Sequence, residues 1–189
     1  MRKRLLLIAL HFMCPLLCSF VQDDSEEVIH WDKSKLLKYS DFKADTSFAK
    51  HSAISCLKII PSLYIDGYKL KYSIRAGFYT GCSYMRHRDK QLLEHEQRHF
   101  DMVEIYARKM RQYLSSCANT RVTTKELNLT LTQIDADLQA VQVLYDKVTQ
   151  HGLKPRAQLH WNKQIDATLD SLNAYGSPDG DVLLEGNFP

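Results

Sequence analysis

The stretch "DKQLLEHEQRHFDMVEIYARKMRQYLS", residues 89–115, predicts a long amphipathic helix around which the rest of the chain can be arranged. Its apolar residues recur at spacings of three and four, as they do on one face of a helix. Asp89 is suited to cap the first turn, because its carboxylate can accept a hydrogen bond from a free backbone N–H group. We therefore expect a helix that begins after Asp89 and runs to about Ser115.

The same helix contains the pattern His-Glu-x-x-His, formed by His95, Glu96 and His99. Residues four apart lie on one face of a helix, so both imidazoles can point at one ion, and neutral imidazole suits Zn²⁺. Glu96 lies about 100° round the helix from His95, where its carboxylate could accept a proton from a zinc-bound water. The alternative is a surface helix with solvated side chains. Three apolar residues close to the direction of the histidines favour an inward face: Leu92, Met102 and Tyr106.

A catalytic zinc site usually has three protein ligands and one open position, so a third ligand is needed. The candidates are Asp101, Glu104, Asp146, His151 and His160. The first two point away from the histidines on their own helix. In "LYDKVTQHG", residues 144–152, His151 lies about 90° and Asp146 about 130° from the centre of the apolar stripe of a second helix. We predict His151 as the third ligand and keep Asp146 as the alternative. Tyr106 and Tyr145 could supply a phenol to an oxyanion, but aromatic residues at helical spacing are more typical of a core.

The other segments predict an α+β domain over residues 23–175, with a small antiparallel sheet first and helices after it. Residues 68–75 alternate between apolar and polar side chains, as in a strand with one solvated face, and Asp66-Gly67 is typical of a hairpin turn. We expect two or three strands between residues 51 and 86. A second long helix is expected from Thr123 or Thr124 to Gly152, followed by a shorter third helix. Residues 176–189 are rich in Gly and Pro and predict a flexible C-terminal tail.

The N-terminal residues predict export. Arg2, Lys3 and Arg4 precede an apolar run, and polarity rises again after Gln22, so residues 1–22 read as a signal peptide. A lipid anchor at Cys18 and an uncleaved membrane anchor stay open as alternatives.

Three of the five cysteines follow the predicted signal peptide, and an oxidising compartment allows at most one disulfide among them. We predict the pair Cys56–Cys82 with Cys117 free, against the alternative of three unpaired thiols. The net charge of +3, without a basic patch, argues against a nucleic-acid partner. A monomer is the simplest expectation, because the stripe of the second helix can be buried against the first.

Four stretches resemble a bacterial family of predicted secreted zinc-dependent proteases, over about residues 28–165. They are "LLKYSDFKA", "LLEHEQRHFDMVEIYARKM", "YDKVTQHG" and "QLHWNKQI". The resemblance implies a zincin-like fold, one Zn²⁺ held by His95 and His99, and Glu96 as the catalytic base. It also implies a peptide or protein substrate and a location in the periplasm or cell envelope, or outside the cell. A different class of function fits the same residues: a non-catalytic, metal-stabilised envelope module.

Overall fold

The computed structural model describes residues 27–47 and 49–185, so the predicted signal peptide lies outside the described residues. The fold is α+β, as predicted: an antiparallel sheet of four strands and three long helices. The strands are β1 (Val28–His30), β2 (Ala53–Asp66), β3 (Lys69–Met85) and β4 (Asp179–Leu183). The helices are α1 (Lys90–Ser116), α2 (Thr124–Thr149) and α3 (Pro155–Ser171), with short 3-10 turns at Tyr39–Asp41 and Asn173–Tyr175.

A long hairpin of β2 and β3 forms most of the sheet. Its turn lies at the predicted place, with Asp66 paired to Lys69 and with Gly67 in the left-handed region at φ +65°. β3 is the central strand: β2 pairs with one edge along nearly its whole length, so β1 and β4 share the opposite edge. Among the described strands, β2 pairs only with β3, and its outer edge is therefore free of a strand partner.

The open end of the hairpin contains a bulge that the alternation of the sequence does not reveal. Ile54 pairs with Tyr84 but Cys56 pairs with Tyr79, so a step of two residues along β2 corresponds to a step of five along β3. The predicted disulfide, Cys56–Cys82, closes this bulge and is confirmed, and Cys117 is a free, buried thiol. The bulge lies directly before α1 in the chain and beside its first turns, because Ser55 contacts a side chain of that helix.

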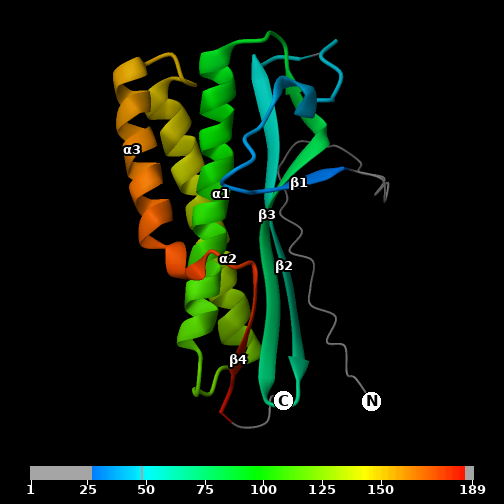
Figure 1. Cartoon of the computed structure of the whole chain (residues 1–189), viewed down its shortest axis with the longest axis vertical. Coiled ribbons are helices and arrows are strands. Elements are labelled where there is room, and N and C mark those ends of the chain that lie inside the picture. Colours follow the sequence, from blue (N-terminus) through cyan, green and yellow to red (C-terminus); the bar gives the residue numbers. More distant parts are fainter. Residues whose placement is uncertain (1–26, 48, 186–189) are drawn as a thin grey trace.

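The first two helices begin at the predicted caps. The side chain of Asp89 accepts a hydrogen bond from Leu92 N at 3.0 Å, and Thr123 and Glu126 form a reciprocal capping box at the start of α2. Figure 1 shows α1 in the middle of the molecule, with the sheet on one side and α2 and α3 on the other. This arrangement explains why α1 buries residues all round its circumference.

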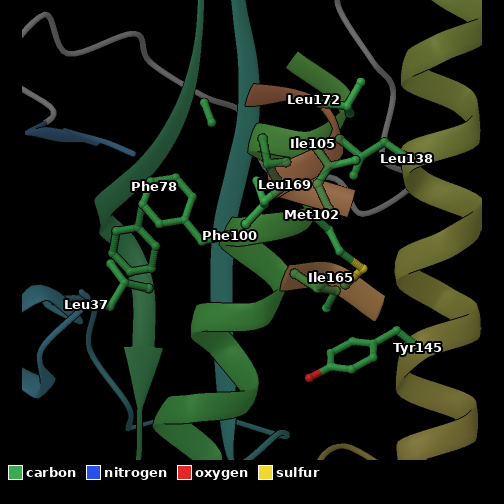
Figure 2. Close-up of a cluster of buried hydrophobic side chains, with 12 residues drawn as sticks. Leu37, Phe78, Phe100, Met102, Ile105, Leu138, Tyr145, Ile165, Leu169 and Leu172 are labelled. Carbon is green, nitrogen blue, oxygen red and sulfur yellow. The ribbon is translucent and has the colours of Figure 1, made fainter. Parts of the chain in front are cut away.

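The core lies between the sheet, α1 and the two outer helices. Figure 2 shows Phe78 of β3 beside Phe100 of α1, while Leu138 and Tyr145 reach in from α2. The two phenylalanine rings are 6.0 Å apart between centroids. A second cluster continues the core toward the other end of α1, around Leu114. The paired clusters fix the rotation of α1 and so decide which of its polar residues face inward.

The predicted flexible tail, residues 176–189, needs a correction. Residues 179–183 form β4, which pairs with residues 69–73 of β3, and Val182 and Leu184 are buried in the core. The short apolar run Val182-Leu183-Leu184 in "DGDVLL" carries this signal, but the neighbouring Gly and Pro residues obscured it. Residues 186–189 lie outside the described part of the chain. Within the described ranges, none of the helices is both long and apolar enough to cross a membrane.

Candidate metal centre

The His-Glu-x-x-His motif lies in the second and third turns of α1, with both histidines directed inward. His95 and His99 are both buried, so the prediction of an inward face is confirmed. Their ring centroids lie 4.8 Å apart with the planes nearly perpendicular, so that both rings reach the same point in space. The phenol ring of Tyr145 stacks on His95 at 4.6 Å between centroids and holds its plane.

The atom that meets the two imidazoles comes from α2. Asp146 Oδ1 lies 3.0 Å from His95 Nε2 and 2.9 Å from His99 Nε2, and the two Nε2 atoms are 3.2 Å apart. These three side chains are the group of possible metal ligands that the structure brings together within its described part. Asp146 thus stands where a third ligand is needed. From the sequence alone, it is only the alternative to His151.

His151, our predicted third ligand, lies outside this group. Its side chain is 70% exposed, and its Nδ1 is 3.4 Å from Asp146 Oδ1. The helix ends before it: Thr149 is the last residue of α2, and residues 150–152 all have positive φ. The ring therefore leaves the direction that helical spacing assigns to it and stands on the rim of the cleft, 6.4 Å between centroids from His95.

The remaining candidates are engaged elsewhere. Asp101 accepts hydrogen bonds from Trp31 Nε1 and Gln97, and Glu104 pairs with two arginines, as their direction on the helix predicts. His160 is exposed on α3. The hydroxyl of Tyr145 lies within the helical layer, where it accepts a hydrogen bond from Gln158. Its phenol is a support for His95 and not a group that faces the cleft.

The outer nitrogens of both imidazoles bond to amide oxygens. His95 Nδ1 lies 3.1 Å from Gln158 Oε1, and His99 Nδ1 lies 2.6 Å from Gln142 Oε1. An imidazole that donates from Nδ1 has a lone pair on Nε2 in its neutral form. Two lone pairs and a carboxylate oxygen then converge, which is unfavourable unless a proton or a cation lies between them. The donor set therefore fits a metal ion.

The charges of the site follow from this crowding. Burial acts to lower the pKa of His99, but the carboxylates of Asp146 and Glu96 outweigh it and raise the pKa above its ordinary 6.5. Partial burial acts to raise the pKa of Asp146, but the hydrogen bonds to His95 and His99 hold it well below its usual 3.8. Asp146 is therefore ionised at neutral pH, and any proton on the imidazoles competes with a metal.

Glu96 stands beside the three ligands without joining them. Its Oε2 accepts a hydrogen bond from Ser55 Oγ at 2.6 Å, which anchors the carboxylate to the bulge of the sheet. The cleft next to it has a volume of about 730 Å³ and is lined by Glu96, His99, Asp146 and His151. Residues 50–55 on the β2 side and residues 142–143 of α2 form its walls. A carboxylate and a potential metal thus share one open cleft.

Sequence reasoning did not single out the groups that support the ligands. Ser55, Gln142, Gln158 and Asn162 are ordinary polar residues whose role depends on partners 13 to 68 positions away in the chain. One signal was present: Gln158 and Asn162 are four apart on a helix and interrupt its otherwise apolar inner face.

A family model matches residues 86–152, which is 67 of the 189 residues, and it is described as "Bacterial protein of unknown function (DUF922)". The matched segment contains α1, α2 and the turn that follows, and so includes His95, Glu96, His99 and Asp146. No curated protein matches the chain. No solved structure matches it either.

Proposed function

We propose that this chain is an exported, zinc-dependent metallopeptidase with His95, His99 and Asp146 as ligands and Glu96 as the base. The convergence of three possible ligand atoms next to the carboxylate of Glu96, which lines the same open cleft, is the observation that carries the proposal. A buried cluster of this kind without a catalytic carboxylate would fit a structural ion equally well.

The ligand chemistry favours zinc. Two imidazole nitrogens and one carboxylate oxygen are a common ligand set of catalytic Zn²⁺, which leaves a fourth position open. Ligand atoms at about 2.0–2.1 Å from a tetrahedral ion are separated by about 3.3 Å. The separations here, 2.9 to 3.2 Å, are close to that value. Hard cations such as Mg²⁺ and Ca²⁺ prefer oxygen ligands and fit this set less well.

When bound, the ion would supply Lewis-acid chemistry, which polarises a carbonyl group and makes a water molecule acidic. Glu96 would take the proton of the attacking water and pass it to the leaving amine. Ser55 would hold the carboxylate in the cleft by donating to one of its oxygens, which leaves the other oxygen free to receive the proton.

The free edge of β2 supports a peptide as the substrate. The first residues of this strand line the cleft, and its outer edge offers backbone N–H and C=O groups that an extended chain can pair with. Main-chain pairing would hold a substrate independently of its sequence and bring one of its carbonyl groups beside Glu96. The cleft walls include both apolar and basic side chains, among them Leu57, Val143 and Lys50.

Two features support action outside the cytoplasm, in the periplasm, in the cell envelope or in the medium. One is the basic and then apolar N-terminal sequence, residues 1–22. The other is the disulfide Cys56–Cys82, because such bonds persist in oxidising compartments.

The test is the variant Glu96→Gln. We expect it to bind zinc as the wild type does, because Glu96 is not a ligand, and to lose peptide hydrolysis by at least about 100-fold, as is typical when a general base is removed. Zinc content after dialysis and cleavage of unstructured protein substrates measure the two properties. Equal cleavage by the variant and the wild type would contradict this mechanism.

The matched control is Asp170→Asn, which changes the charge equally at an exposed residue of α3 that pairs with Lys33. This variant should keep both zinc and activity. Zinc bound to wild type without any hydrolysis would instead favour the metal-stabilised module.

A further inference from the structure

We propose that Glu94, acting through Asn162 and Gln158, is a positioning residue that fixes the ring hydrogen of His95 on Nδ1. We call these three side chains the amide relay. The relay keeps the Nε2 lone pair of His95 directed at the metal position. The proposal rests on the proposed metal site and assigns a function to the two buried amides of α3, which the catalytic groups do not explain.

The relay is a continuous chain of hydrogen bonds from the protein surface to the ligand. Glu94 Oε1 accepts from Asn162 Nδ2 at 2.7 Å, and Asn162 Oδ1 accepts from Gln158 Nε2 at 2.7 Å. Gln158 Oε1 then lies 3.1 Å from His95 Nδ1. Gln158 and Asn162 are buried, whereas Glu94 is exposed, so the chain crosses the interface of α1 and α3 from outside to inside.

The direction of every bond in the relay follows from Glu94 alone. An ionised carboxylate only accepts, so the atom of Asn162 that faces it must be the amide nitrogen. This leaves the oxygen of Asn162 toward Gln158, which must present its own nitrogen there and its oxygen to His95. The hydroxyl of Tyr145 accepts from Gln158 Nε2 at 2.5 Å and donates to the backbone oxygen of His95 over a long 3.5 Å. A hydroxyl can turn to donate or to accept, so it adapts to either orientation of Gln158 and does not by itself decide the direction.

If the amide of Gln158 were not fixed in direction, His95 could adopt a second tautomer, with its hydrogen on Nε2, that would oppose metal binding. Its Nε2 lies 3.0 Å from Asp146 Oδ1, and a hydrogen on that nitrogen would form a charge-assisted bond with the carboxylate. That hydrogen would occupy the lone pair that a metal needs. An amide that can rotate, such as Gln158 uncoupled from Glu94, would accept this tautomer by offering its nitrogen to Nδ1. The relay makes the blocking tautomer unfavourable.

The other ligand lacks this control. His99 Nδ1 bonds to Gln142, a residue of the cleft wall, and no carboxylate among the described residues fixes the direction of that amide. Groups that bond to the outer nitrogen of a metal-ligating histidine commonly affect metal affinity about 10–100-fold. We expect the fixed relay on His95 to act near the lower end of this range, because its controlling group is three hydrogen bonds from the ring.

The test starts with Glu94→Gln, which keeps the shape of the side chain but removes its fixed direction. We expect its affinity for Zn²⁺, measured by competition with a chromophoric chelator, to fall about tenfold. In the metal-free protein, ¹⁵N shifts of the imidazoles should show His95 protonated on Nδ1 in the wild type and partly on Nε2 in the variant. A change of stability alone would not move this second measurement.

The double variant Glu94→Gln, Asn162→Asp provides the rescue. Its new carboxylate at position 162 accepts from Gln158 on one side and from the glutamine at position 94 on the other. The direction of the relay is restored, and we expect wild-type affinity and an Nδ1 hydrogen. The control Asp166→Asn removes an α3 carboxylate that bonds to Arg98 of α1, with the same change of charge and no link to His95. It should leave both measurements unchanged.

Unchanged zinc affinity and unchanged ¹⁵N shifts in Glu94→Gln would overturn the relay, and so would a double variant that stays as weak as the single one. These outcomes are separate from the proposed function. A wild type that binds no zinc would refute the metal site, whereas zinc-dependent hydrolysis with an inert Glu94 would refute only the relay.

Discussion

The two halves of α1 both bury charged and polar side chains, but they satisfy these groups in different ways. In the C-terminal half, Glu104 accepts from Arg108 Nε at 2.9 Å and from Arg111 Nη2 at 3.0 Å. The same arginines donate to the backbone oxygens of Leu169 and Tyr175. In the N-terminal half, two imidazole nitrogens and one carboxylate oxygen lie within 3.2 Å of one another, and they need a proton or a cation between them. We call the first network complete, because its charges balance, and the second incomplete, because its atoms need a proton or a metal ion between them.

Both networks also form hydrogen bonds with the last part of the chain. The arginines of the C-terminal half hold the segment that leads to β4, because their partners are backbone oxygens of α3 and of the 3-10 turn after it. The N-terminal half receives two buried amides of α3 that bond to its side chains. The C-terminal half of α1 is thus held by ion pairs, whereas side chains of its N-terminal half bond to neutral amides.

The largest effect is expected from breaking the complete network. Glu104→Leu would leave the guanidinium groups of Arg108 and Arg111 buried without their carboxylate. Removing one partner of a buried ion pair costs about 3–5 kcal/mol. We expect the free energy of unfolding in urea to fall by that amount, equally with zinc and with a chelator present. A loss no greater than that of the surface variant Asp170→Asn would show that this network is not structural.

The next largest effect is expected from the incomplete network and concerns metal binding. Asp146→Ala removes one of the three proposed ligands, and we expect zinc affinity to fall by more than about 100-fold, beyond the range of supporting groups. His151→Ala should change it less than about threefold, because that side chain is largely exposed and outside the ligand group. Isothermal titration of both metal-free variants measures the difference. The reverse order would make His151 the third ligand, as its place in the sequence suggested.

A smaller effect is expected from the turn after α2, which contacts His95 and lines the cleft. Gly152 has φ +83°, and a Cβ there would lie 3.2 Å from Cβ of His95. We expect Gly152→Ala to lower the free energy of unfolding by about 1–2 kcal/mol, the cost of a left-handed backbone for an L-residue, and to weaken zinc binding by displacing the imidazole.

Gly67→Ala is the matched control, because Gly67 has φ +65° but no atom within 4 Å of the added carbon. Its backbone cost should be similar and its zinc affinity unchanged. Equal zinc binding by the two alanine variants would mean that the contact of Gly152 with His95 does not position the ring.

Several errors of prediction have one physical origin, which is that short elements depend on partners. The sequence predicted the hairpin of β2 and β3 but not β1, which has three residues, or β4, which has five. Neither could be stable by itself in water. Each becomes a strand because β3 offers it an edge, 50 and about 110 residues away in the chain. The Gly and Pro residues around β4 indicated the turns there, but they gave no sign of its pairing with β3.

The sequence by itself determined the features that depend on near neighbours. Asp89 and Thr123 set the starts of two helices, Asp66-Gly67 set the hairpin turn, and the spacing of His95 and His99 put both imidazoles on one face. Such features need only local hydrogen bonds and the 3.6-residue period, so a sequence specifies them directly.

Only the tertiary structure decided which residue meets those imidazoles. The angular argument that favoured His151 assumed that α2 continues to that position, but α2 ends at Thr149 and the backbone enters three left-handed residues. The rotation of α2, fixed by Leu138 and Tyr145 in the core, directs Asp146 at the histidines instead. Ser55, Gln158 and Asn162 reach the site from a bulge and a third helix. These side chains come from different helices and strands, so the packing of the whole core determines which of them meet.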